Sequence, residues 1–137
     1  MSREYRFINL AIKIAGLSEH RFPLGAVITR GSIIQSVGVN KYKSHPLQIN
    51  PNTDLPGDSI HAEFDAVSKM RNLIGNKIYI ARVRHDGSTG NARPCRTCRI
   101  LLINKGIYIV NYTTSQKGFI KEDLRDVSFT RSKFKWG

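Results

Sequence analysis

The order of helix-like and strand-like segments is the feature that most constrains the fold of this 137-residue chain. Apolar residues recur at three- and four-residue spacing between Phe7 and Leu17, which predicts an amphipathic helix ending near Gly16. Two segments rich in β-branched residues, 24–29 and 32–39, are separated by a short turn signal and predict a hairpin. The other predicted elements are a helix capped by Asp58 or Ser59 and ending at Gly75-Asn76, a strand at 77–83, a helix from Pro94 to about Lys105, and strands at 107–112 and 119–121. This order predicts an α/β sandwich around one sheet.

Length and composition are those of one globular domain. A chain of 137 residues with 40% hydrophobic residues has enough apolar surface for one core, so we expect one domain over residues 1–137. Its formal net charge of +12 favours anionic partners such as phosphates, nucleic acid or an acidic membrane surface. A basic tail, 131–137, adds to this charge. The alternative is a basic surface that only aids solubility.

The lack of a recognisable targeting signal and the placement of the cysteines predict a cytoplasmic protein. The N-terminal residues contain no apolar segment before a small-residue cleavage site, and no apolar run approaches about 18 residues. The two cysteines, Cys95 and Cys98, lie within one short segment, unlike cysteines that close long loops. We therefore expect a reduced, cytosolic protein with no membrane association.

Two stretches of the sequence predict loops. Between Asn40 and Asp58 the apolar pattern stops, and three prolines and a glycine interrupt the chain. A connection of this length in a small domain is usually functional, and often a lid. The polar segment 85–93 predicts a second loop, whereas 100–103 is apolar on nearly every side of its helix and predicts burial.

Two short motifs contain the residue types that bind zinc. His61-Ala62-Glu63 begins one predicted helix, and Pro94-Cys95-Arg96-Thr97-Cys98 begins another. Because His61 and Glu63 lie about 200° apart around a helix, both can serve one ion only if the helix start points at the site. One His and two Cys leave the fourth tetrahedral position for water, as in catalytic zinc sites, where the metal lowers the pKa of water to about 7. Glu63 could then take the proton of this water and deliver it to a leaving nitrogen, which is the chemistry of amine hydrolysis.

Each motif, taken alone, is compatible with several roles. Cys95 and Cys98 could be a redox pair or two buried thiols, and His61 could be a helix cap or a core residue. A closed structural zinc site would need a fourth protein ligand, for which the candidates are His20, His45 and His85. Together, the two motifs and their spacing match the signature of zinc deaminases.

These motifs resemble those of the cytidine and deoxycytidylate deaminase superfamily, over residues 7–112. The resemblance implies a three-layer α/β/α sandwich with a mixed sheet of roughly five strands and one zinc ion between two helix starts. It implies that His61, Cys95 and Cys98 bind zinc and that Glu63 is the catalytic proton shuttle. The substrate contacts that it implies are Asn40 at the sugar, Ala26 and Val27 in a wall of the base pocket, and Ala62 and Pro94 within the two motifs. It also implies that the protein forms homo-oligomers.

These residues do not decide between the subfamilies. Arg99 and the hairpin predicted from 107–112 and 119–121 resemble the branch that acts on nucleosides, whereas His61 resembles deaminases of deoxycytidylate, transfer RNA and polynucleotides. The leading hypothesis is a deaminase of a free nucleotide, (deoxy)cytidylate. Its candidate phosphate contacts are Arg21, Lys41, Lys43 and His45.

The alternative hypothesis is an editing deaminase of cytosine or adenine in single-stranded DNA or RNA. Such an enzyme needs a basic track with stacking aromatic residues. The candidate track consists of Arg82, Arg84, Arg93, Arg96, Arg99 and the tail residues Arg131, Lys133, Phe134, Lys135 and Trp136. A zinc-stabilised nucleic-acid-binding module is a third hypothesis, but such a module has no use for Glu63.

Overall fold

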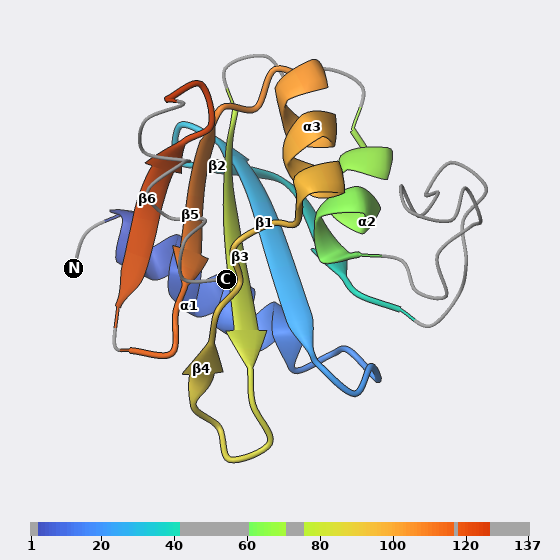
Figure 1. Ribbon diagram of the computed structural model, residues 1–137, viewed down its shortest axis with the longest axis vertical. Coiled ribbons are helices and arrows are strands. Elements are labelled where there is room, and N and C mark those ends of the chain that lie inside the picture. Colours follow the sequence, from blue (N-terminus) through green and yellow to red (C-terminus); the bar gives the residue numbers. More distant parts are fainter. Residues whose placement is uncertain (1–2, 42–60, 71–75, 117, 127–137) are drawn as a thin grey trace.

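The β-branched segments form one mixed sheet (Figure 1). A computed structural model describes residues 3–41, 61–70, 76–116 and 118–126. Within them the strands are β1 (Leu24–Arg30), β2 (Ile33–Val39), β3 (Lys77–Val83), β4 (Thr89–Gly90), β5 (Ile109–Thr113) and β6 (Phe119–Asp123). The helices are α1 (Arg3–Ala15), α2 (Ala62–Ser68) and α3 (Arg96–Asn104).

The sheet has the order β2-β1-β3-β5-β6, with β4 paired to β3 outside this path. β1 pairs antiparallel with both β2 and β3, and β5 pairs antiparallel with β6. β3 and β5 run parallel, and α3 connects them as a crossover helix. The predicted hairpins are thus confirmed, and the short strand β4 lies where a loop was expected.

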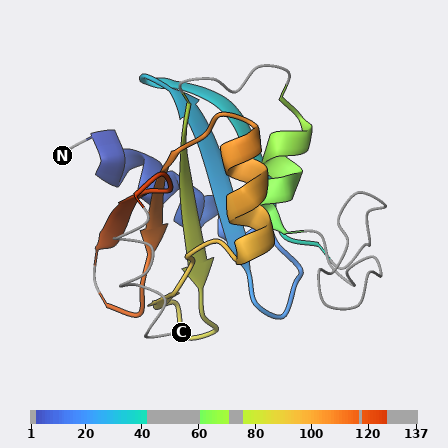
Figure 2. The ribbon, with the colours of Figure 1, turned by 45° about the horizontal axis from the view of Figure 1, so that its top comes forward.

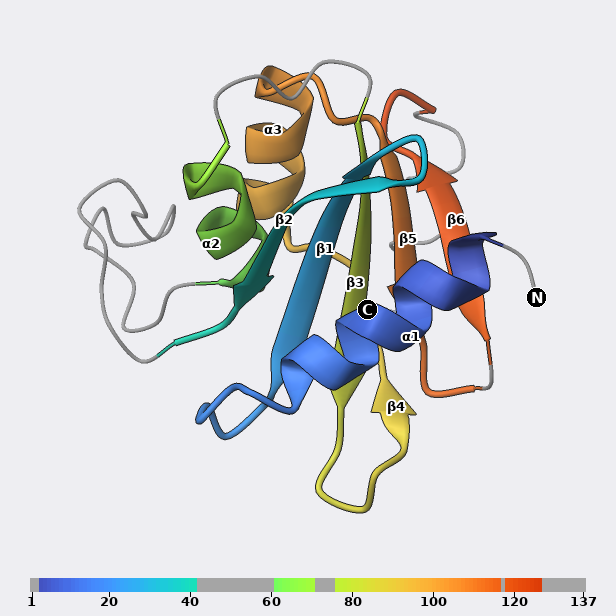
Figure 3. The same ribbon diagram turned by 180° about the vertical axis from the view of Figure 1, so that it is seen from behind.

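Helices cover both faces of the sheet. α1 crosses one face (Figure 3), and α2 and α3 lie side by side on the other (Figures 1 and 2). On the α1 face, Phe7 and Ala11 pack in a cluster with Val27 and Tyr79. On the other face a larger cluster joins the strands to the helices, and it includes Ala26, Ile28, Ala62, Ala66, Ile78, Ile80 and Leu102. The prediction of three layers is therefore confirmed.

Both motif helices begin later than predicted. His61 is the N-cap of α2 and has extended backbone angles, φ −73° and ψ 151°, so the helix begins at Ala62 and not at Asp58 or Ser59. α2 ends at Ser68, well before the predicted stop at Gly75. Cys95 is the N-cap of α3, which places Pro94 just outside the helix. A metal-binding residue at an N-cap can turn away from the helix axis, and periodicity alone does not show this shift.

The prediction that residues 100–103 are buried throughout is wrong. Leu102 is fully buried, whereas Ile100 and Ile103 are 49% and 38% exposed. α3 contacts the sheet along one side only, so an apolar run on it has an exposed face.

Several predictions concern residues outside the described part of the chain. These are most of the long 40–58 loop, Lys43, His45 and the basic tail 131–137. Within the described residues, no helix has the length and apolar character needed to cross a bilayer.

Candidate metal centre and pocket

The starts of α2 and α3 lie next to each other on one face of the sheet (Figure 2). Gly38 on β2 makes this arrangement possible, because a Cβ atom there would lie 2.5 Å from the Ala62 carbonyl oxygen and 2.5 Å from the Ala66 nitrogen. A larger residue at position 38 would push α2 off the strand. The backbone of α2 therefore packs directly on β2, which sets the height of His61 and Glu63 above the sheet.

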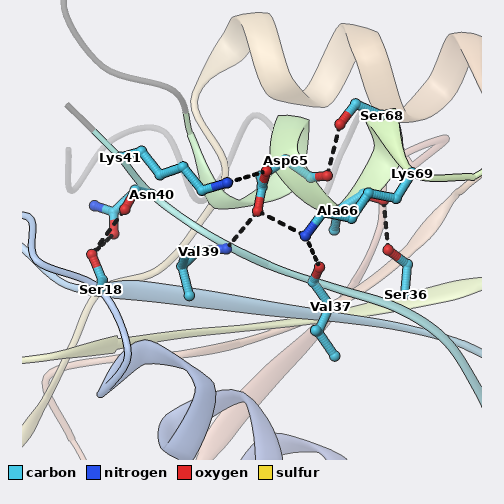
Figure 4. A network of polar contacts seen from close by, with 10 residues as sticks. All are labelled: Ser18, Ser36, Val37, Val39, Asn40, Lys41, Asp65, Ala66, Ser68 and Lys69. Carbon is cyan, nitrogen blue, oxygen red and sulfur yellow. Dashed lines mark hydrogen bonds and ion pairs between the residues drawn. The ribbon is translucent and has the colours of Figure 1, made fainter. Parts of the chain in front are cut away.

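The side chain of Asp65 on α2 also holds this helix against β2, through hydrogen bonds (Figure 4). Its carboxylate accepts hydrogen bonds from the Val39 backbone N–H at 3.1 Å, from Lys41 at 3.0 Å and from Lys69 at 3.2 Å. Ser36 adds a hydrogen bond of 2.8 Å to the Ala66 carbonyl. Burial raises the pKa of Asp65, but these hydrogen bonds and the two ammonium groups outweigh it and hold the pKa below its usual range. The start of α2 is thus held by polar contacts as well as by packing.

His61, Cys95 and Cys98 converge on one point. Their ligand atoms all lie within 4.8 Å of one another, with His61 Nδ1 3.3 Å from Cys98 Sγ and 3.6 Å from Cys95 Sγ. Zn–N bonds of about 2.05 Å and Zn–S bonds of about 2.3 Å at tetrahedral angles place nitrogen and sulfur about 3.6 Å apart. The three side chains therefore fit one tetrahedral zinc ion and leave one position for a small ligand. In the described part of the chain, neither His20 nor His85 belongs to this cluster, so no fourth ligand is found there.

The two cysteines differ in their surroundings. Cys95 is exposed at the N-cap of α3, whereas Cys98 is buried one turn later. A hydrogen bond with Cys98 lowers the pKa of Cys95 to about 4, and His61 adds to this effect against the cost of burial. The thiolate is the form of cysteine that binds metal, and it also benefits from the positive end of the helix dipole.

Glu63 lies beside the three candidate ligands. It belongs to the first turn of α2, its residue is 4% exposed, and its carboxyl reaches the same pocket as His61 and Cys95. Burial raises the pKa of Glu63 above its ordinary value, and His61 counteracts part of the rise. A carboxyl group in this setting is well placed to accept and return a proton.

A pocket of about 440 Å³ opens over this cluster. Its volume is within the range typical of sites for small ligands. The pocket is lined by His20, Phe22, Leu24, Asn40, His61, Glu63, Arg82, Asn91, Ala92, Arg93 and Cys95.

Of the predicted substrate contacts, only Asn40 lines this pocket. Its Oδ1 accepts hydrogen bonds from Ser18 Oγ at 2.6 Å and from the Leu24 N–H at 2.9 Å, and its Nδ2 donates to the Phe22 carbonyl at 2.6 Å. Figure 4 shows the Ser18 contact. Asn40 thus ties the end of β2 to the chain entering β1. The contact of Asn40 with a sugar stays a prediction from the sequence.

The predicted pocket wall on β1 needs a correction. Side chains alternate along a strand, and Val27 packs against α1 on the opposite face of the sheet. Ala26 lies on the correct face but is fully buried in the core, as is Ala62. Pro94 is buried too, and none of the three lines the pocket. Leu24, two residues before Ala26, takes the position that had been expected for Ala26 and Val27.

Sequence reasoning did not find Phe22 and did not place Arg82 or Arg93 in the pocket. Phe22 lies between the end of α1 and β1, and it is half exposed. Arg82 is the penultimate residue of β3, and Arg93 directly precedes the Pro-Cys motif. An aromatic residue two positions before a predicted strand was the available signal for Phe22.

The part of the predicted basic track that the structure describes does not form a continuous surface. Arg93 is buried and forms two hydrogen bonds, of 2.9 and 3.0 Å, with the carboxylate of Glu122 on β6. Arg99 is also buried and donates to the Pro94 carbonyl at 2.7 Å. Tyr112 donates to Glu122 at 3.1 Å, so that the carboxylate joins β5, β6 and the chain before α3. These arginines therefore support the cysteine motif from within the protein.

The fold and the cluster together define a class of protein. It is an α/β protein with a metal-binding centre between two helix starts and a buried glutamate beside it. The family model for the cytidine and deoxycytidylate deaminase zinc-binding region matches residues 1–114. The chain therefore belongs to the cytidine and deoxycytidylate deaminase family, whose members are zinc-binding hydrolases that act on C–N bonds.

Solved structures of this family share the fold. A dCMP deaminase from the cyanophage S-TIM5 is 20% identical, with a TM-score of 0.59 over 81% of this chain and 82% of that chain. A cytidine deaminase from Burkholderia pseudomallei is 19% identical, with a TM-score of 0.65 over 92% of this chain and 95% of that chain. One from Mycobacterium leprae is 20% identical, with a TM-score of 0.57 over 88% and 94%. No curated protein sequence matches the chain significantly.

Proposed function

We propose that this chain is a hydrolytic deaminase that converts the cytosine of a free nucleotide, (deoxy)cytidylate, to uracil. The observation that carries the proposal is the position of Glu63, which is buried in the wall of the pocket next to His61 and Cys95. A structural metal site has no need for a carboxyl group that faces both the ligands and an open cavity.

The residues divide the chemistry between them. A zinc ion held by His61, Cys95 and Cys98 would supply the Lewis acidity that lowers the pKa of a water molecule. Glu63 takes a proton from that water and delivers it to the amino nitrogen, so that a C–O bond replaces the C–N bond and ammonia leaves. Burial of Glu63 keeps bulk water from competing for this proton.

Two observations support a free nucleotide. The cyanophage S-TIM5 dCMP deaminase, which shares the fold, has been solved in complex with dCMP and dUMP, and it covers 82% of this chain at 20% identity. The pocket of about 440 Å³ is also large enough for one such ligand. A cytoplasmic location and homo-oligomeric assembly stay predictions from the sequence.

Editing of a single strand is the alternative, and the described residues support it less. Arg93 and Arg99 lie inside the protein, while Arg84 and Arg96 are exposed. Removing residues 131–137 tests the alternative directly. If three basic residues of the tail contact phosphates, the log–log salt slope of single-strand binding should flatten by about two units.

The experiment is a deamination screen of the zinc-loaded protein. Cytosine and adenine are offered as base, nucleoside, mono- and triphosphate and single-stranded oligomer, and Glu63→Gln is the matched control. We expect turnover of (deoxy)cytidylate, and a loss of about 10²–10⁴-fold in Glu63→Gln with zinc content unchanged. Near wild-type turnover by Glu63→Gln would contradict the mechanism, and turnover of oligomers alone would contradict the substrate.

A further inference from the structure

Two arginines line the pocket, and their surroundings differ. The guanidinium of Arg93 is matched by the carboxylate of Glu122, and both side chains are almost completely buried, with 5% and 1% exposed. Arg82 lines the same pocket, and among the described residues no carboxylate lies within ion-pair distance of it. Arg82 is thus the arginine of this pocket whose charge is left for a ligand.

The position of Arg82 is set by three contacts. Its backbone N–H donates to Thr113 Oγ1 at 3.1 Å, which holds the end of β3 against β5. Its side chain passes over Gly90 of β4, where a Cβ atom would lie 3.1 Å from Arg82 Cδ. Its guanidinium then stands 5.1 Å from the centre of the Phe22 ring. A guanidinium stacked on an aromatic ring keeps its N–H donors free at its edge.

Of the residues predicted to contact a phosphate, Lys43 and His45 lie outside the described part of the chain, and Lys41 and Arg21 are not positioned for this contact. Lys41 forms an ion pair with Asp65 at 3.0 Å, on the side of α2 that faces β2. Arg21 is exposed and does not line the pocket. Among the described residues, Arg82 is therefore better placed than Lys41 or Arg21 to contact a phosphate group.

We infer that Arg82 binds the phosphate group of the substrate and so makes the pocket select nucleotides over nucleosides. The inference rests on the proposed function for the identity of the substrate. A planar guanidinium can donate two parallel hydrogen bonds to phosphate oxygens, which gives direction as well as charge. The metal-binding cluster and Arg82 would then hold the two ends of one nucleotide.

The test compares a nucleotide and a nucleoside on the same variants. Calorimetry measures the binding of dUMP and of deoxyuridine to zinc-loaded wild type, Arg82→Ala, Arg82→Lys and the control Arg30→Ala, which changes an exposed arginine at the end of β1 that does not line the pocket. We expect Arg82→Ala to weaken dUMP binding by about 10- to 100-fold, the usual range for a lost hydrogen bond to a charged group. The affinity of Arg82→Lys for dUMP should lie between those of wild type and Arg82→Ala, and Arg30→Ala should match wild type.

Each outcome separates the inference from the proposed function. Equal weakening of dUMP and deoxyuridine in Arg82→Ala, or a wild type that binds both equally, would overturn the inference even if (deoxy)cytidylate is deaminated. An Arg82-dependent preference for dUMP would uphold it even if the wild type fails to deaminate (deoxy)cytidylate, in which case only the proposed function falls. A single-stranded oligonucleotide forms the third arm. If Arg82→Ala weakens only that ligand, the phosphate belongs to a polynucleotide and the assignment to a free nucleotide is wrong.

Discussion

The floor and the rim of the pocket are built in different ways. We call the candidate metal ligands and the glutamate beside them the floor: these are His61, Glu63, Cys95 and Cys98, all within two short motifs at the starts of α2 and α3. We call the lining residues that come from other segments the rim. The rim consists of residues from several separate segments: His20, Phe22, Asn40, Arg82 and Arg93. The residues of the floor are therefore encoded locally, whereas those of the rim are brought together by long-range contacts. The following predictions test this difference, from the largest expected effect to the smallest.

The largest effect is expected at the floor, where Cys98→Ala removes a buried ligand. Because three protein ligands hold the metal, we expect about one zinc ion per wild-type chain and a fall toward zero in the variant, with loss of all measurable deamination. Metal analysis of the purified proteins measures this. Ile100→Ala, on the exposed face of the same helix, is the control and should keep its zinc. Unchanged zinc in Cys98→Ala would contradict the assignment of the floor.

The support of the rim is tested by Glu122→Gln. This change leaves the buried Arg93 cation without its counter-charge, and such a loss typically lowers the free energy of unfolding by about 3–5 kcal/mol. Denaturant unfolding monitored by circular dichroism measures the change. Asp123→Asn is the matched control, because its partner Arg125 is 59% exposed and surface pairs contribute about 0–1 kcal/mol. Equal effects of the two variants would mean that the buried pair has no special role.

The support of the floor is tested by Asp65→Asn, whose effect should be smaller and should depend on pH. We expect a loss of about 1–3 kcal/mol in the free energy of unfolding at pH 7, since charged hydrogen bonds to Lys41, Lys69 and the Val39 N–H are weakened. The folded-state pKa of Asp65 is lowered, so its contribution is complete above the unfolded-state pKa of about 3.9 and is lost as the pH falls through the folded-state value.

The pH dependence of this effect distinguishes a loss of charge from a loss of packing. The difference between wild type and Asp65→Asn should shrink below about pH 4, whereas the difference between wild type and Ser36→Ala, which removes an uncharged hydrogen bond to the same helix, should not follow this pH dependence. A difference that stays constant down to acid pH would show that packing, and not charge, explains the effect.

The smallest effect is expected for Gly90→Ala at the rim. The added Cβ would press on the side chain of Arg82 and displace it slightly, which we expect to weaken dUMP binding by about two- to tenfold. A double-mutant cycle provides the control. In an Arg82→Ala background the Gly90→Ala change should have no further effect on dUMP binding. Additive losses would show that Gly90 acts on the pocket by another route.

The difference between floor and rim also accounts for the predictions that failed. Periodicity along β1 shows that Ala26 and Val27 point to opposite faces, but it does not say which face holds the pocket, and Val27 packs against α1. The net charge gives the number of charged residues but does not show which arginines form ion pairs inside the protein. Arg93 forms an ion pair with Glu122, which lies on a strand much later in the chain. A residue predicted to be on the surface is therefore buried and supports the fold.

The sequence by itself determined the order of the elements and the residues of the floor. Hydrophobic periodicity is a local property, and the ligands His61, Cys95 and Cys98 lie in motifs whose spacing already requires two helix starts to face one point. Tertiary structure decided the rest. It placed His61 and Cys95 at N-caps and brought Phe22, Asn40 and Arg82 to one rim. It also paired Arg93 with Glu122, whereas Arg82 has no carboxylate partner among the described residues. These choices depend on contacts between residues far apart in the chain, and such contacts exist only once the sheet has formed.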